Sequence, residues 1–396
     1  MIPYGKQDII QADIDAVVDV LQNQFLTQGT QVPAFEKAIS EYCNVEYCIA
    51  VNSGTSALHV ACLALDIGEG DLVWTTPITF VASANCARYC GADIDFVDID
   101  PVTRNLSITQ LAEKLEIAEK ANRLPKALVC VHYAGQSCDM QAINQLGQRY
   151  GFKIIEDASH ALGAKYQNKL VGNCQYSDCT VFSFHPVKPI TTAEGGALVT
   201  NNSALYQKAT LHAKHGVTRD DSLLEPQYRS VADGDWYYQQ IELGYNYRLS
   251  DIHAALGLSQ LQRIDTYIQR RLHVAERYQH AFEAQSTTLP QLTLPQLSVD
   301  SGWHLYVVEL PFQLRKLAFD YFRTHKIGVN VHYIPVHLQP YYQKLGFKQG
   351  DFPHAESFYA GAITLPIHPN LTLPEQEKVI SCMRDFLTSV SHQLNA

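Results

Sequence analysis

The stretch YCIAVNSGTSALHVACLAL, residues 47–65, decides the fold class. Residues 47–51 are apolar, as expected for a strand that is buried on both faces. Ser53, Gly54 and Thr55 then supply a strand-to-helix turn with good capping residues, and a helix is expected to run through Leu65. A buried strand followed at once by a helix is the repeating unit of a parallel α/β sheet.

The same alternation of strand and helix continues outward from this stretch to about residue 160. Further strands are expected at 72–75, 94–97, 127–132 and 153–156, with helices at 81–90, 107–120 and 140–150. Two shorter apolar runs, 180–184 and 196–200, flank a turn and are expected to add mixed strands. The pattern therefore predicts a mostly parallel sheet that is covered by helices on both faces.

The remaining sequence indicates a second, smaller unit. A helix is expected at 8–22 and a long loop at 220–240. One long helix is expected from Ser250 to about 284, followed by a linker at 285–302. The last part of the chain is expected to form strands at 305–310 and 329–333, and helices at 315–325 and after Pro374. We therefore expect a large domain over residues 1–250 and, over 251–396, a connecting helix with a small C-terminal αβ domain.

Composition limits the kinds of partner and compartment. The chain has 396 residues and a net charge of −10, which argues against a general attraction to nucleic acid or anionic membranes. It contains neither a run of about 20 apolar residues nor the layout of a signal peptide, so a cytoplasmic location is expected. The 10 cysteines form no paired CxxC frame and mostly have apolar neighbours, and we interpret them as free buried thiols.

Lys188 is the first candidate for chemistry. It lies in FSFHPVKPITTAEGG, residues 182–196, between two apolar runs and close to paired glycines. A partly buried lysine is a better amine nucleophile because it loses ammonium hydration, and it can hold an aldehyde cofactor as a Schiff base. Alone the signal is weak, because most lysines near turns are solvated.

Asp157 and His160 follow the apolar strand expected at 153–156. Ligands of open α/β sheets bind at the carboxyl ends of the strands, so an acid there could protonate the ring nitrogen of pyridoxal 5'-phosphate (PLP). His160 could then hydrogen-bond the ring hydroxyl. From this segment alone, Asp157 as an ordinary helix cap is the favoured alternative.

Ser53, Gly54 and Thr55 form the third candidate. Free amides at a helix N-terminus bind phosphate, although Ser and Thr are also ordinary caps. The chain contains neither GxxxxGK[ST] nor a GxGxxG after the first strand. Each of the three features is common, but their order over a doubly wound core is not.

With these motifs the chain resembles the fold-type I PLP-dependent aminotransferases that act on sugar nucleotides, the family of DegT, DnrJ, EryC and StrS-type proteins. The resemblance covers almost the whole chain and rests on FLTQG (25–29), SGTSALH (53–59), PITFVA (77–82), EDASHA (156–161), FSFHPVK (182–188) and GYNYRLSD (244–251). It implies a large domain with a seven-stranded, mostly parallel sheet between helices.

The resemblance also implies roles for individual residues. Lys188 corresponds to the Schiff-base lysine and Asp157 to the partner of the pyridine nitrogen. The other cofactor contacts implied are His160, Phe80, which stacks on the ring, the phosphate contacts Gly54, Thr55 and Ser183, and Asn246, which reaches the phosphate from a neighbouring subunit. A homodimer with shared active sites is therefore expected. Without the resemblance, Phe80 would be assigned to the core and Asn246 to a turn.

Within this family the chain is most similar to a branch that aminates C4 of a UDP-linked 4-keto-6-deoxy-N-acetylhexosamine with L-glutamate, on the route to pseudaminic acid. This branch is indicated by KPITTAEGG (188–196), HYAG (132–135) and VHYIP (331–335), and by Ala193, where many relatives have Gly. By the same resemblance the sugar nucleotide is contacted by Tyr4, Leu26, Thr27, Gln28, His332 and Tyr333.

Other functions remain as alternatives. A different keto-sugar, such as UDP-4-keto-6-deoxy-GlcNAc or a GDP- or dTDP-linked sugar, would use the same scaffold, whereas the dehydratase branch has His in place of Lys188. A non-enzymatic PLP-binding regulator is disfavoured by the charge of −10. No metal site is expected: His212 and His215 fit one helical face but lack a carboxylate that would complete a ligand set.

Overall fold

A seven-stranded sheet forms the centre of the computed structural model, which describes residues 1–229, 234–284 and 292–394. Its strands lie in the order β1-β9-β8-β5-β4-β2-β3. Their bounds are β1 Tyr47–Val51, β2 Leu72–Thr75, β3 Asp93–Phe96, β4 Ala127–Val131, β5 Lys153–Asp157, β8 Cys179–Ser183 and β9 Gly196–Thr200. Each expected strand between residues 47 and 200 is present to within about two residues.

The sheet is mostly parallel, as expected. The pairs β2–β3, β2–β4, β4–β5 and β5–β8 are parallel. Strand β9 is antiparallel to both β1 and β8, which confirms that residues 180–184 and 196–200 contribute to a mixed part of the sheet. The parallel register places Asp157, at the end of β5, opposite Val131 and Val181, so several strands end along one edge.

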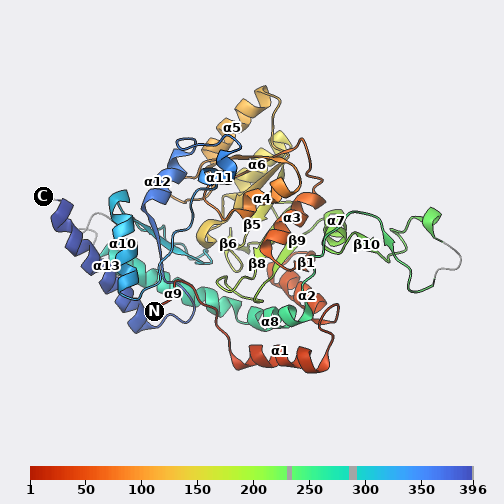
Figure 1. Ribbon diagram of the computed structural model, residues 1–396, viewed down its shortest axis with the longest axis horizontal. Helices are drawn as coiled ribbons and strands as arrows, with labels where there is room; N and C mark the ends of the chain where they lie inside the picture. The colour runs from red at the N-terminus through yellow and green to blue at the C-terminus, as the bar shows by residue number, and fades with distance from the viewer. Residues whose placement is uncertain (230–233, 285–291, 395–396) are drawn as a thin grey trace.

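Helices cover both faces of the sheet because successive strand residues point to opposite sides. One face packs against α3 (Gly54–Ala64), α4 (Ala82–Tyr89) and α7 (Ser203–Ala213), in a core that includes Ile49 and Val51. The opposite face packs against α2 (Gln31–Cys43), α5 (Ile108–Lys120), α6 (Met140–Tyr150) and α8 (Asp251–Leu261). The helix α1 (Gln11–Asn23) packs on α8, outside this layer (Figure 1).

The C-terminal part of the chain has its own core. Strands β12 (Tyr306–Glu309) and β13 (Ala362–Leu365) pair antiparallel, and α9 (Ile264–Glu283), α10 (Phe312–Thr324) and α13 (Leu373–Leu394) pack around them. The N-terminus joins this unit, because Ile2 bridges to Ile327 and is buried in the same cluster. In Figure 1 the start of the chain and α13 accordingly lie close together. The proposed domain boundary at residue 250 stays a prediction.

Shorter elements complete the described residues. These are β6 (Lys165–Tyr166), β7 (Lys169–Leu170), β10 (Val217–Thr218), β11 (Gln239–Gln240), α11 (Pro340–Gln343), α12 (Pro353–Gly361), and 3-10 turns at Tyr133–Gly135, Pro226–Tyr228 and Val336–Leu338. The small β10–β11 pair flanks the long loop expected at 220–240, because β10 precedes the loop and β11 ends it; this part of the chain projects from the body of the molecule in Figure 1. Residues 230–233 of that loop and 285–291 of the expected linker lie outside the described residues.

Three expectations from the sequence are wrong. The single helix from Ser250 to about 284 is two helices, α8 and α9, separated at Gln262 and Arg263. The expected strand at 329–333 is only an isolated bridge from Asn330 to Thr364. His212 and His215 do not share a helical face, because α7 ends at Ala213.

These errors have physical causes. The guanidinium of Arg263 pairs with both carboxylate oxygens of the fully buried Asp13, and this tertiary contact lies at the break between the helices. His332 and Tyr333 leave the sheet to line a cavity instead of continuing a ladder. His215 has a left-handed φ of 62°, which a helix cannot contain.

Two further expectations can be compared with the structure. All 10 cysteines are free and all but Cys90 are buried, which confirms their interpretation as buried thiols. No helix in the described ranges combines the length and apolar character needed to cross a bilayer.

Candidate functional site

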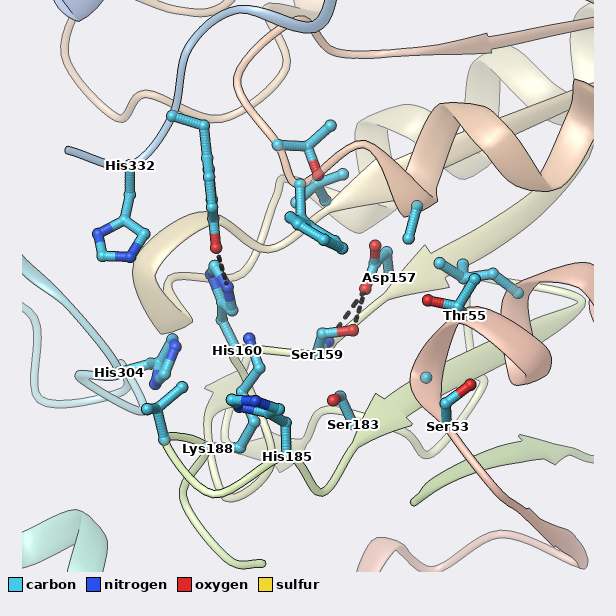
Figure 2. Close-up of a pocket in the computed structure, with 18 of the residues that line it drawn as sticks. Ser53, Thr55, Asp157, Ser159, His160, Ser183, His185, Lys188, His304 and His332 are labelled. Atoms are coloured by element: carbon cyan, nitrogen blue, oxygen red, sulfur yellow. Dashed lines mark hydrogen bonds between the residues drawn. The ribbon is translucent and has the colours of Figure 1, made fainter. Parts of the chain in front are cut away.

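A cavity of about 490 Å³ lies at the carboxyl ends of the central strands. Val131, Asp157 and Ser183 reach it from the ends of β4, β5 and β8, and the N-terminus of α3 forms one end of it. The loops that carry His304 and residues 330–333 close the opposite end (Figure 2). This edge of an open α/β sheet is where ligands usually bind.

The N-terminus of α3 offers unpaired donors to the cavity. Ser53 caps the helix, since its hydroxyl accepts the amide of Ser56 at 3.0 Å. In the described structure the amides of Gly54 and Thr55 have no hydrogen-bond partner and line the cavity. A Cβ on Gly54 would lie 2.9 Å from the Cβ of Ser183, so the turn approaches β8 too closely for a side chain. Two free amides and the hydroxyls of Thr55 and Ser183 form an anion site.

Asp157 does not cap a helix, which was the favoured alternative. No helix follows β5, and the carboxylate instead faces the cavity. Its Oδ2 accepts the Ser83 hydroxyl at 2.6 Å, and its Oδ1 accepts the hydroxyl and the amide of Ser159 at 2.6 and 3.1 Å. A buried carboxylate held by three donors stays fixed toward any cationic group in the cavity.

Lys188 projects into the cavity from the turn between β8 and β9. Burial lowers its pKa from the ordinary 10.5 to about 8, although the charge of Asp157 opposes this shift. The described residues include no ion-pair partner for its amine, and no other lysine or arginine lines the cavity. Because its pKa is low, a substantial fraction of this amine is neutral near pH 8.

Imidazoles and a tyrosine form the wall beside Lys188. His160 Nε2 hydrogen-bonds the Tyr333 hydroxyl at 3.0 Å, and the ring of His304 lies 4.4 Å from that of His160, centroid to centroid. His332 Nδ1 bonds Thr364 Oγ1 at 2.8 Å. Burial lowers the pKa of each of the three histidines, that of His332 to about 3, so they are neutral at physiological pH.

These histidines are not arranged as metal ligands. Within the described ranges, no group of three or more His, Cys, Asp or Glu side chains could hold a metal ion. The wall therefore presents neutral hydrogen-bonding groups to an organic ligand.

Phe80 and Tyr4 border the same cavity. Phe80 is 57% exposed although it is large and apolar, so it is not the core residue that its sequence context alone indicates. Its ring lies 6.3 Å from that of Tyr333, and the ring of Tyr4 lies 5.4 Å from that of His332. An exposed aromatic at a cavity wall can stack on a flat ligand.

The structure brings most of the predicted site residues together and leaves four outside. Tyr4, Gly54, Thr55, Phe80, Asp157, His160, Ser183, Lys188, His332 and Tyr333 all line the cavity. Leu26, Thr27 and Gln28 lie exposed after α1, and Asn246 is exposed beside Lys214, so none of them lines the cavity of their own chain. The roles predicted for these four residues stay predictions.

Several cavity or supporting residues were not predicted. Ser83 is fully buried on α4, and His304 comes from a loop before β12. The cavity is also lined by Ser159, His185, Glu194 and Asn330. Ser159 and Asn330 could have been found as neighbours of predicted motifs, whereas Ser83 and His304 carry no local signal because only the tertiary fold brings them to Asp157 and His160.

Comparisons with known proteins agree over nearly the full length. A model described as the DegT/DnrJ/EryC1/StrS aminotransferase family matches residues 7–384. The UDP-4-amino-4,6-dideoxy-N-acetyl-beta-L-altrosamine transaminase of Campylobacter jejuni serotype O:2 is 37% identical over 395 residues, covering 98% of each chain.

Two solved structures resemble the fold closely. Helicobacter pylori PseC, an aminotransferase involved in the biosynthesis of pseudoaminic acid, superposes with a TM-score of 0.87 at 33% identity over 98% of this chain and 99% of its own. The PLP form of Spr1654 from Streptococcus pneumoniae gives a TM-score of 0.86 at 28% identity, with 98% and 99% coverage.

Proposed function

The chain belongs to the DegT/DnrJ/EryC1/StrS family of PLP-dependent sugar aminotransferases, and we propose that it transfers the amino group of L-glutamate to C4 of UDP-4-keto-6-deoxy-L-N-acetylaltrosamine. The product is the 4-amino sugar used for pseudaminic acid. The observation that carries this proposal is Lys188, an amine of lowered pKa inside a cavity that also holds a fixed carboxylate and an anion cradle.

The residues of the cavity fit PLP. The free amides of Gly54 and Thr55, with Ser183 too close for any side chain at position 54, suit the phosphate. Asp157 supplies a charged acceptor for the ring nitrogen, and Phe80 supplies a flat surface. We assign His160 to the ring hydroxyl and Lys188 to the aldehyde.

PLP, when bound, supplies an aldehyde for amines and a protonated ring that accepts electrons from a broken C–H bond. The chain supplies the rest. The Lys188 amine would take the proton from Cα of glutamate and hand it to the aldehyde-derived carbon of the cofactor, and for the sugar it would move a proton the opposite way, from that carbon to C4. Asp157, held by Ser83 and Ser159, keeps the ring nitrogen protonated. Because glutamate and the sugar react in turn at one cavity, ping-pong kinetics are expected.

The sugar is proposed from the named relatives. The Campylobacter relative is a transaminase of this UDP-amino sugar, and PseC acts in pseudoaminic acid biosynthesis. Tyr4, His332 and Tyr333 lie on the cavity wall beside Lys188, where the sugar must present its ketone. We therefore assign these three side chains to the sugar nucleotide.

We further propose that the active protein is a homodimer with shared sites. The outer surface of α1 and the residues after it expose an apolar stripe made of Ile10, Ile14, Val18, Leu21, Phe25 and Leu26. The projecting loop exposes Tyr228, Trp236 and Leu243. Exposed apolar surface of this extent is typical of an interface. A second copy that covers it would bring Leu26, Thr27, Gln28 and Asn246 to the neighbouring cavity.

The test is the visible absorbance of the PLP-loaded protein. We expect the band of the lysine-bound cofactor to fade with L-glutamate and to return with UDP-4-keto-6-deoxy-L-N-acetylaltrosamine but not with its gluco epimer. A band that returns only with another nucleotide-linked keto-sugar would keep the aminotransferase and overturn the substrate. A band unaffected by glutamate but changed by glutamine would overturn the donor.

A further inference from the structure

Arg271 is a buried guanidinium without an acidic partner. It lies in α9, is 1% exposed, and forms no ion pair with any described carboxylate. Its Nη1 donates instead to three backbone carbonyls, those of Ile367 at 3.1 Å, Trp303 at 3.3 Å and His304 at 3.4 Å. Burying an unpaired charge is costly, and core packing alone would be served better by an apolar side chain.

The carbonyls that Arg271 binds belong to the segment that brings His304 to the cavity. On its other side this segment is fixed to the loop after β4, because the amide of His304 donates to Ala134 O and the amide of Gly302 to Gly135 O, both at 2.9 Å. Gly135 has a φ of +100°, and a Cβ there would lie 2.9 Å from the amide nitrogen of Trp303. His304 is thus held from two sides.

The third carbonyl belongs to a second segment that reaches the cavity. The amide of Ile367 donates to Tyr4 O at 2.9 Å, so the segment whose carbonyl Arg271 binds is also bonded to the backbone of Tyr4. One guanidinium therefore ties α9 to both segments that place His304 and Tyr4 beside Lys188. All three bonds come from one nitrogen, Nη1, at the end of the buried guanidinium.

The ring of His304 packs against that of His160. The two rings are 4.4 Å apart, and His160 Nε2 bonds Tyr333 (Figure 2). Nδ1 of His304 is buried with no partner among the described residues, so Nε2 is the ring nitrogen left for the cavity. The charged and titratable groups around this ring are His160, Lys188, Arg271 and His332. Burial is the larger cause that lowers the pKa of His304, and the charges of these groups lower it further, so the ring is neutral.

We propose that Arg271 is a positioning residue of the active site, which acts through His304 to hold His160 in place beside Lys188. The inference rests on the proposed role of Lys188. If the proposal is right, replacing Arg271 changes the reaction at the cofactor and does not only lower the stability of the protein.

The experiment compares Arg271→Met with Arg270→Met in the PLP-loaded protein. Arg270 precedes Arg271 on the same helix but is exposed and reaches only Asn370. We expect Arg271→Met to slow the glutamate-driven fading of the visible band on the order of 10²-fold, as for a misplaced reacting group. We also expect the pH titration of the band to shift, whereas Arg270→Met leaves both unchanged.

Two more variants identify the route. His304→Gln keeps an amide near Nε2 and is expected to recover part of the rate that His304→Leu loses. In a double-mutant cycle, Arg271→Met combined with His304→Leu should be no slower than the worse single variant, because Arg271 acts through His304. If Arg271→Met does not fold, Arg271→Gln replaces it in the cycle with the same expectation, because its shorter side chain does not reach the three carbonyls.

Three results would overturn the proposal: an Arg271 variant with the spectrum and rate of Arg270→Met, additive effects in the cycle, or a loss of thermal stability without change at the band. A wild-type protein that shows no band at all would instead mean that the role of Lys188 is wrong. The two failures are therefore distinguishable.

Discussion

Replacing Lys188 should make the protein without PLP more stable. The change is Lys188→Met, which keeps the length of the side chain and removes its charge. In the folded apoprotein, burial lowers the pKa of Lys188 from 10.5 to about 8, so the charged amine destabilises the fold wherever it stays protonated. Catalytic groups commonly carry such a cost in stability.

The magnitude follows from the difference between the two pKa values. At about 1.4 kcal/mol for each pH unit, the protonated amine costs the folded state about 3 kcal/mol. Below pH 8 the amine is protonated in both states and the cost is complete. Between pH 8 and 10.5 the unfolded chain binds a proton that the folded chain does not, so the stability of the wild type rises with pH and the advantage of the variant disappears.

Urea denaturation of the apoproteins at pH 7 and near pH 10 measures this difference at a fixed protein concentration. Packing of the new methionine changes the free energy of unfolding by an amount that does not depend on pH. The decisive quantity is therefore how the difference in stability between Lys188→Met and the wild type changes from pH 7 to pH 10. Lys344→Met, at an exposed lysine, is the matched control and should show no such trend. A Lys188→Met advantage that is absent at pH 7, or equal at both pH values, would refute the reasoning.

Three further predictions concern the cofactor and the partner subunit. Gly54→Ala places a Cβ 2.9 Å from that of Ser183 and should raise the Kd for PLP about tenfold or more. The control is Gly68→Ala, whose Cβ meets nothing within 4 Å and which should leave the Kd unchanged. Titration with PLP, followed by fluorescence, measures both values. The association rate of PLP with the apoprotein should rise with pH through about 8 as Lys188 loses its proton, and stopped-flow data that are flat between pH 6.5 and 9 would contradict this. Inactive Lys188→Ala and Asn246→Ala proteins should regain activity when refolded together, because mixed dimers contain one intact shared site; no recovery would argue against sharing.

The sheet could be predicted from the sequence because its signals are local. The seven strands of the central sheet are short, mostly apolar runs, and most of them are followed by a helix before the next strand of the sheet. The break between α8 and α9 could not be predicted in this way. It coincides with the contact from Arg263 to Asp13, which lie 250 positions apart, and the sequence at the break contains neither Gly nor Pro.

The same distinction applies to the site. Asp157 ends one strand of the sheet, and Gly54 and Lys188 follow two others. They meet because these strands end along one edge of the sheet. His304 and Arg271 come from the C-terminal part of the chain, and no spacing in the sequence relates them to Lys188. Leu26 to Gln28 and Asn246 lie outside the cavity, and their predicted roles at a shared site are not tested by the structure of one chain.

The most direct test of the account is to find which residue carries the cofactor. The PLP-loaded protein is reduced with borohydride, which fixes PLP to the amine that holds it, and is then digested and analysed by peptide mass spectrometry. The account predicts the modified residue to be Lys188, with the label lost in Lys188→Met. Label on another lysine, or an unmodified Lys188 in protein that shows the visible band, would contradict it.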